Sequence, residues 1–296
     1  MSFVRKNDYS DEVINGVKEL IKAANTINRP IIVVPSVDCI ICYYGGLPFA
    51  YISEDGWGRY SDDYEKYIDL QFENYKEALL DPTDNWKKLM TVLDGIERGL
   101  PTDYERHTEQ KIVLYNSSFD VEKYSVCGFE AKVTDIDNGA PEADMIVFCP
   151  NEKRMLLVEY KCRYGALYPS KGHGIREHGD DYARILKNYK SINFIGEIIK
   201  AYNVLCKIYD KDTVSMNPDE VQLDMVFLLT GNTIRDAERG TKGNITLRAN
   251  KGAMKVMREY NGRDYTNEIK NKVYWMWNDD FNKVVFSKEN MERLIE

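Results

Sequence analysis

Apolar and polar positions alternate along the chain in patterns that predict both helices and strands. Within residues 9–28, apolar side chains recur every three or four positions, which predicts an amphipathic helix with Ser10 as its N-cap. The short apolar runs that follow predict three strands, over 31–34, 39–44 and 48–53. Gly45 and Gly46 lie between the last two runs and predict a tight hairpin turn, because such turns need residues that tolerate positive φ.

Helical periodicity returns in residues 61–80 and 84–98, and a Gly-Leu-Pro stretch at 99–101 ends the second of these helices. The chain is long enough for a catalytic core and a smaller accessory domain. We therefore predict an accessory α+β region over 1–100, and a core with a C-terminal extension over 101–296.

A different order of elements begins at residue 102. The pattern predicts a helix, three strands, one long helix and a fourth strand, over residues 102–115, 121–134, 143–149, 155–162, 178–209 and 223–230. Gly128 predicts a bend or bulge in the first of these strands. A polar turn at 150–153 joins the next two strands into a hairpin, and their apolar runs indicate burial on both faces. This order predicts an α/β fold.

Three charged side chains lie on the predicted hairpin. Asp144 is at the start of its first strand, whereas Glu159 and Lys161 are two residues apart on the second and project from the same face. Their neighbours are apolar, and a buried ion costs several kcal/mol unless it is paired or bound to a metal. Two explanations stay open: a functional site that compensates these charges, or a hairpin with one exposed face on which Glu159 and Lys161 are solvated.

A divalent metal would compensate the two carboxylates. Mg²⁺ takes oxygen ligands, commonly one or two carboxylates completed by water and by substrate phosphate. Asp144 and Glu159 are the candidate ligands, with the backbone carbonyl of Tyr160 as a further one. Lys161 would then lie where it can orient a metal-activated water or stabilise the charge that develops on a phosphate.

The segment from Pro141 to Asp144, followed by the E-x-K sequence that starts at Glu159, resembles the signature of the PD-(D/E)XK nuclease superfamily. The order of elements from 102 to 230 is similar to the restriction-endonuclease-like αβββαβ core of that superfamily, which has a mixed central sheet. The resemblance implies a nuclease that depends on a divalent metal, usually Mg²⁺, with Mn²⁺ as an alternative. In this chain the proline stands three residues before the aspartate instead of next to it.

The same resemblance implies a further carboxylate on the first core helix. Glu105 and Glu109 are four residues apart on one helical face, and we choose Glu109 because Glu105 has a capping role. A solvated helix charge is an equally good explanation for either residue. Some relatives also place a glutamine and a tyrosine on the second core helix, where this chain has Tyr182 and Tyr189 but no glutamine.

Basic residues after the proposed catalytic strand are candidates for phosphate contacts. Residues 163–178 form a loop rich in glycine, basic and aromatic side chains, and basic residues recur at three-residue spacing on the following helix. The candidates are Arg163, Lys171, Arg176, Arg184 and Lys187. A mobile surface loop and a solvated helix face are the alternatives.

Charge and composition limit the partners of the protein. The chain has a net charge of −8, which argues against tight non-specific binding to nucleic acid, but residues 151–210 hold 11 Lys and Arg against 7 Asp and Glu. No apolar run approaches the ~20 residues of a membrane span, and the N-terminus has no signal-peptide core, so we expect a cytoplasmic protein. The six cysteines are spread thinly and are expected to be buried free thiols.

These observations together favour an intracellular Mg²⁺-dependent nuclease that hydrolyses phosphodiester bonds, with DNA the expected substrate by analogy with the superfamily. One alternative is an inactive nuclease-like fold that binds nucleic acid or protein. A third is a small-molecule enzyme on another α/β fold, which predicts Asp144 and Glu159 far apart or on opposite sheet faces. Homodimerisation or a partner protein stays open.

Overall fold

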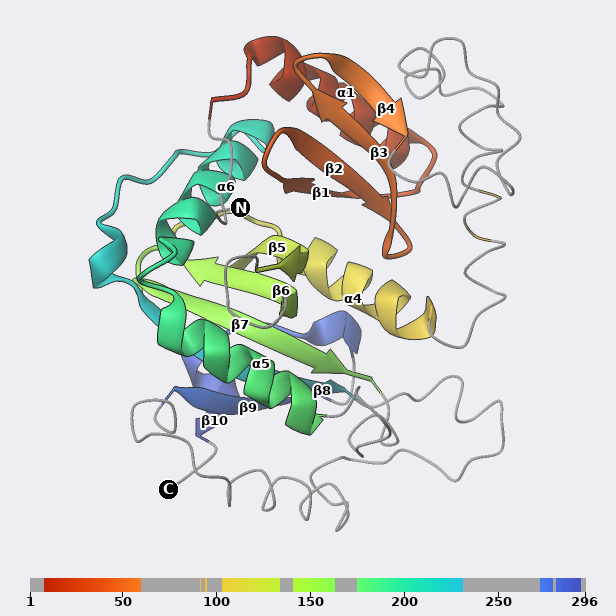
Figure 1. Ribbon diagram of the computed structural model, residues 1–296. Helices are drawn as coiled ribbons and strands as arrows, with labels where there is room; N and C mark the ends of the chain where they lie inside the picture. Colours follow the sequence, from red (N-terminus) through yellow and green to blue (C-terminus); the bar gives the residue numbers. More distant parts are fainter. Residues whose placement is uncertain are drawn as a thin grey trace, which may run out of the picture. The chain divides into compact units, whose positions relative to one another are not determined.

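A computed structural model describes residues 8–59, 91, 94, 103–133, 141–162, 175–230, 272–278 and 281–293 of the 296-residue chain (Figure 1). The chain divides into two compact units. The small-sheet unit comprises Val4–Leu114 and Glu197–Ser215, and the large-sheet unit comprises Met1–Phe3, Tyr115–Gly196 and Met216–Glu296. Each unit combines helices with one β-sheet, which confirms the predicted α/β class.

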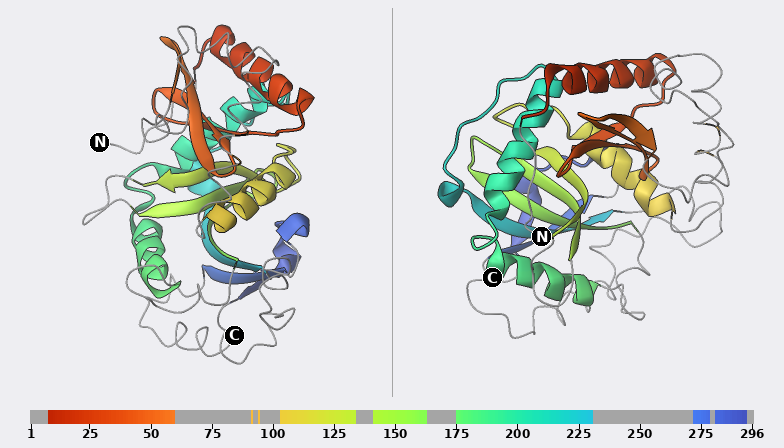
Figure 2. Two further views of the ribbon diagram at one scale, coloured as in Figure 1. Left: turned by 90° about the vertical axis from the view of Figure 1, so that its right-hand side faces the viewer. Right: turned by 45° about the horizontal axis from the view of Figure 1, so that its top comes forward.

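The small-sheet unit contains an antiparallel sheet of order β1-β2-β3-β4. Its first elements are α1 (Asp11–Thr26), β1 (Ile32–Pro35), β2 (Cys39–Tyr44), β3 (Leu47–Ser53) and β4 (Gly56–Arg59). Helix α1 packs against β3 and runs alongside the sheet (Figure 2). The predicted cap is confirmed, because the Ser10 hydroxyl accepts a hydrogen bond of 3.3 Å from the Val13 N–H.

The hairpin between β2 and β3 is confirmed, and both turn glycines have positive φ: 60° for Gly45 and 77° for Gly46. Strand β4 was not predicted, since its Gly-Trp-Gly-Arg sequence has little strand propensity. Gly58 of β4 leaves space for the ring of Tyr51, the residue opposite it on β3. A Cβ at Gly58 would lie 2.2 Å from Cζ of Tyr51. The bare backbone therefore lets an aromatic ring cover this edge strand.

Helix α4 (Asp103–Tyr115) confirms the helix predicted from residue 102. Gln110 ties it to the small-sheet unit: its side-chain oxygen accepts from the Gly46 N–H at 3.0 Å, and its nitrogen donates to the Pro30 carbonyl at 3.2 Å. The helices predicted over 61–80 and 84–98 fall outside the described residues, apart from residues 91 and 94. The boundary predicted at 99–101 also falls outside them, so the two predicted domains stay a prediction.

The large-sheet unit is built on a mixed six-stranded sheet of order β10-β9-β8-β7-β6-β5, which confirms the predicted mixed sheet. Antiparallel pairing joins β5 to β6, β6 to β7 and β9 to β10, whereas β7–β8 and β8–β9 are parallel. The strands are β5 (Ser125–Lys132), β6 (Glu142–Cys149), β7 (Arg154–Lys161), β8 (Gln222–Thr230), β9 (Val273–Asn278) and β10 (Met291–Arg293). Three short 3₁₀ helices complete the described elements: Pro218–Glu220, Phe281–Lys283 and Lys288–Asn290.

The predicted hairpin lies between β5 and β8 in the large sheet, and β7 is buried along its whole length. The turn between β6 and β7 covers residues 150–153, as predicted. The predicted irregularity in β5 is confirmed as well, because the register between β5 and β6 shifts between Val126 and Gly128. A Cβ on Gly128 would lie 3.0 Å from Ile146, so the glycine also allows close packing between the strands.

The single long helix predicted over 178–209 is wrong, because two helices occupy this range: α5 (Ile175–Asn188) and α6 (Phe194–Ile208). No glycine or proline marks the break. Polar groups end α5 instead, since the Asn188 side chain donates to the Arg184 carbonyl at 2.9 Å and the Ser191 hydroxyl to the Asn188 carbonyl at 2.7 Å. Asn193 then takes a left-handed conformation with φ of 50°.

Helix α5 lies along one face of the large sheet and packs against β7 and β8 (Figures 1 and 2). In the order of elements it stands between β7 and α6. Within the described residues, no helix is long and apolar enough to cross a membrane. All six cysteines are free thiols, as predicted, and only Cys39 is half-buried.

Candidate functional site

Glu159 and Lys161 are buried on β7. Glu159 has no exposed surface, and the Lys161 side chain is 9% exposed. The Lys161 Nζ lies 2.6 Å from Glu159 Oε1, as expected for two side chains on one face of a strand. The alternative of a solvated hairpin face is therefore wrong.

Asp144 lies next to this pair on β6. The ladder between β6 and β7 begins with Met145 opposite Val158, so continuing its register by one residue places Asp144 opposite Glu159. Residues that face each other across an antiparallel pair share one face of the sheet, with Cβ atoms about 5 Å apart. The half-buried Asp144 side chain also crosses to β7, where its Oδ2 accepts the Tyr160 N–H at 2.7 Å. The two carboxylates thus lie on the same face and on adjacent strands.

Helix α5 contributes Tyr182 to the same place. The buried Tyr182 hydroxyl accepts a hydrogen bond of 3.2 Å from the Asp144 N–H and donates one of 3.1 Å to the Val158 carbonyl. Burial raises the pKa of Tyr182 well above 10, and the nearby Glu159 and Asp144 charges raise it further, so the phenol keeps its proton. Tyr182 therefore connects α5 to both strands that carry the carboxylates.

His178 lies one helical turn before Tyr182. Its Nδ1 is 3.4 Å from Glu159 Oε1, and its side chain is 26% exposed. The residue therefore lies between the buried carboxylate and the surface of the unit. Because His178 and Tyr182 are four residues apart, they share the face of α5 that packs on the sheet.

Burial dominates the electrostatics of Glu159. It raises the pKa of this carboxyl to about 8, the Asp144 charge adds to the increase, and Lys161 and Tyr182 oppose it. The Lys161 ammonium is close enough to form an ion pair with Glu159. Lys161 and Tyr182 lie close enough to Glu159 to favour its ionised form, but burial and the Asp144 charge outweigh them. The carboxylate is thus buried with only part of its charge compensated.

This arrangement has the donor atoms for a hard divalent cation. Glu159 and Asp144 offer carboxylate oxygens, and Mg²⁺ needs only one or two protein carboxylates when water and phosphate complete its shell. In the described parts of the chain, no group of three or more His, Cys, Asp and Glu side chains is placed to hold a metal.

The structure places the remaining predicted residues in different ways. Glu109 is 3% exposed on α4, so the solvated-charge alternative is wrong for it, and it belongs to the small-sheet unit. Arg184 pairs with Asp181, whereas Lys187 is exposed. The other three predicted phosphate contacts lie outside the described residues: Arg163, Lys171 and the side chain of Arg176.

The sequence reasoning missed His178 and left Tyr182 without a role. A signal for both exists, since an amphipathic helix that follows the proposed catalytic strand must turn one face to the sheet. Polar side chains four residues apart on that face point to a polar site beneath it. The backbone carbonyl of Tyr160 stays a predicted metal ligand. The side-chain hydroxyl of the same residue lies 2.8 Å from Thr230 Oγ1, within hydrogen-bonding distance.

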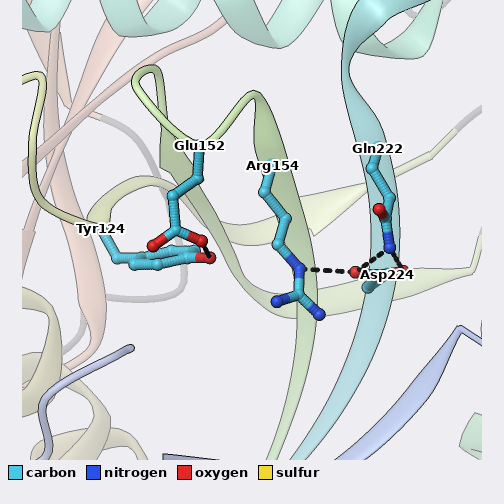
Figure 3. A network of polar contacts seen from close by, with 5 residues as sticks. All are labelled: Tyr124, Glu152, Arg154, Gln222 and Asp224. Atoms are coloured by element: carbon cyan, nitrogen blue, oxygen red, sulfur yellow. Dashed lines mark hydrogen bonds and ion pairs between the residues drawn. The ribbon is translucent and has the colours of Figure 1, made fainter. Parts of the chain in front are cut away.

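A second buried charged pair lies at the opposite end of β7. Arg154 Nε donates to Asp224 Oδ2 at 2.6 Å, and the Gln222 side chain donates to both oxygens of Asp224 at 2.8 Å (Figure 3). The Arg154 guanidinium also lies 4.8 Å from the centre of the Tyr274 ring. Asp224 is fully buried, so this pair is compensated inside the unit and joins the first residues of β7 to β8.

Comparison with protein-family models, with curated proteins and with solved structures gives no match for this chain.

Proposed function

We propose that the chain is a metal-dependent nuclease that hydrolyses phosphodiester bonds. One observation carries the proposal: a fully buried, incompletely compensated Glu159 lies opposite Asp144 and beside Lys161 on a sheet face. Acid pairs that share a face in a low-dielectric environment are costly, and they persist where a cation or a reaction needs them. The predicted E-x-K pattern and this geometry support the same site.

The residues present fit a divalent cation. Glu159 and Asp144 would hold it, because both carboxylates lie on one face and the Glu159 carboxyl is fully buried with only part of its charge compensated. Such an ion, when bound, supplies Lewis acidity that activates water for attack on a phosphorus atom. We expect Mg²⁺ in this role, with Mn²⁺ as a substitute.

The other residues have roles that follow from their contacts. Lys161 brings a positive charge to the face that carries both carboxylates, where it can stabilise the negative charge that develops on a phosphate during hydrolysis. Tyr182 fixes the strand positions through the Asp144 N–H and the Val158 carbonyl, so it is a positioning residue. Glu109 stays a candidate for a supporting role.

The order of elements supports the restriction-endonuclease-like part of this proposal. Helix α4 is followed by three antiparallel strands, by α5 and α6, and by β8, which pairs in parallel with β7. A substrate of DNA rests on analogy with the superfamily alone. Cytoplasmic localisation and homodimerisation likewise stay predictions.

Cleavage assays on the full chain test the proposal. Labelled plasmid, single-stranded DNA and RNA are incubated with Mg²⁺, Mn²⁺ or EDTA. We expect metal-dependent cleavage, and a loss of roughly 100-fold or more in rate for Lys161→Ala and for Glu159→Gln, as for other groups that stabilise transition-state charge. Lys123→Ala, which changes an exposed lysine of the same unit, is the matched control and should cut like wild type.

Circular dichroism must show that each variant is folded before its rate is interpreted. If folded wild-type protein cuts no substrate with either metal, the alternative of an inactive nuclease-like binding module gains support. If Lys161→Ala cuts as fast as wild type, the site has been assigned to the wrong residues.

A further inference from the structure

Three lysines gather where α5 ends in the large-sheet unit. Lys187 is in the last turn of α5, Lys190 follows two residues after its end, and Lys272 directly precedes β9. The Lys272 Nζ lies 5.2 Å from the centre of the half-buried Tyr189 ring, which brings the β9 lysine to the end of the helix. We call these three lysines the α5-end surface.

None of these ammonium groups forms an ion pair within the residues that the structure describes. Lys187 and Lys190 are exposed, and Lys272 is half-buried. Asp181 on α5 is paired with Arg184, and Asp224, on which the Lys272 charge acts, is paired with Arg154. Among the described residues, the surface therefore carries a local excess of positive charge, in a chain whose net charge is −8.

Helix capping does not explain the whole cluster. A lysine in the last turn of a helix interacts favourably with the helix dipole, which accounts for Lys187. Lys190 lies beyond the helix, however, and Lys272 comes from a different part of the chain. Lysine side chains are common partners of backbone phosphates, so a cluster of three of them suits a chain of phosphate groups.

The distance between the α5-end surface and the carboxylates matches the spacing of several phosphates along one nucleic-acid strand. His178 lies at the carboxylates and Lys187 is nine residues further along α5, so a rise of 1.5 Å per residue separates them by about 13 Å. Neighbouring phosphates of one DNA strand are about 3.4 Å apart along the helix axis, so this distance spans about four nucleotides.

We propose that the α5-end surface holds the phosphate backbone of a polynucleotide about four nucleotides from the bond that is cut. The substrate is then a strand of at least about five nucleotides, and a mononucleotide or dinucleotide is too short to engage both places. This inference rests on the nuclease proposal and adds the substrate class.

Binding of fluorescein-labelled DNA, measured by anisotropy in EDTA, tests the inference without cleavage. The substrates are single strands of about 4 and about 20 nucleotides and a duplex of about 20 base pairs, titrated between 50 and 200 mM KCl. The test variant is Lys187→Gln/Lys190→Gln/Lys272→Gln. The control variant removes the same number of positive charges from three exposed lysines elsewhere in the chain: Lys123→Gln/Lys211→Gln/Lys288→Gln.

We expect the test variant to bind the longer strand at least about tenfold more weakly than wild type. The slope of log affinity against log salt should become shallower by about 2 to 3, because each lost phosphate contact removes about 0.7 to 0.9. The control variant should keep most of the wild-type slope. Wild type should bind the short strand much more weakly than the long one.

Two results overturn the inference and leave the nuclease proposal standing. One is a test variant that binds the long strand with wild-type affinity and salt slope. The other is a wild type that binds both strand lengths equally well. If wild type neither binds DNA in this assay nor cuts it with Mg²⁺ or Mn²⁺, both proposals fail together.

Discussion

Glu159 shows how strongly burial changes the chemistry of one carboxyl group. On an exposed surface this side chain would be ionised at neutral pH, but inside the sheet its pKa rises to about 8. The metal-free protein therefore keeps much of this group protonated near pH 7. A bound divalent cation would favour the ionised form, so proton and cation compete for the same oxygens.

A pH dependence of stability follows from this pKa. The folded state binds the Glu159 proton more tightly than the unfolded chain, whose value is near 4.5. The contribution of Glu159 to the free energy of unfolding is therefore most favourable below about pH 4.5, and it is lost as the pH rises through about 8. Glu159→Gln has no such titration, so in EDTA its stability relative to wild type should increase from pH 5 to pH 9.

Urea unfolding at several pH values measures this difference. Glu19→Gln, which changes an exposed glutamate, serves as the control, and its stability relative to wild type should stay nearly constant. A constant difference for Glu159→Gln over the same pH range would contradict the account of the buried carboxyl.

The sequence alone predicts a residue's place correctly where that place follows from its spacing along one strand or helix. Glu159 and Lys161 are two apart on a strand, so their shared face follows from strand geometry. The contacts of Tyr182 and His178 depend on how α5 packs onto the sheet, and that is a tertiary property. The burial of Glu109 has the same origin, because only packing distinguishes it from a solvated helix charge.

Among the elements, the strands of the large sheet were the easiest to predict. The runs over 143–149, 155–162 and 223–230 are apolar and long, and β6, β7 and β8 follow them within one residue at each end. The break between α5 and α6 was missed, since side-chain hydrogen bonds to backbone carbonyls cause it and no glycine or proline marks it.

The pair of Arg154 and Asp224 fixes the starts of two elements, β7 and β8. Asp224→Ala would leave the buried Arg154 guanidinium uncompensated, so we expect a loss of about 3 to 5 kcal/mol in the free energy of unfolding. Chemical denaturation of the metal-free protein measures this loss. Glu220→Ala removes the partner of Lys153 in an exposed pair, and it should cost about 1 kcal/mol or less.

The contrast between these two variants tests the role of burial. Each removes the acidic partner of a basic residue, which is the buried Arg154 at the start of β7 or the exposed Lys153 just before it. Equal losses of stability for Asp224→Ala and Glu220→Ala would contradict the assignment of Arg154 and Asp224 as the group that fixes the ends of these strands.

For the whole molecule, the net charge is negative, whereas the charge at the end of α5 is positive. The chain is acidic as a whole, and residues 1–150 hold 15 Lys and Arg against 27 Asp and Glu. The α5-end surface and the proposed site nevertheless lie in one unit, the large-sheet unit. Binding of a polyanion is then governed by the field near that unit, and it should weaken steeply with salt.

Calorimetric titration of the metal-free full chain with Mn²⁺ and Mg²⁺ tests the central claim most directly. We expect a metal site in wild type whose affinity falls at least about tenfold in Asp144→Asn and in Glu159→Gln, because each change removes a charged oxygen ligand. Glu19→Gln should bind like wild type. Absence of metal binding by wild type, or equal affinities in wild type and both site variants, would contradict it.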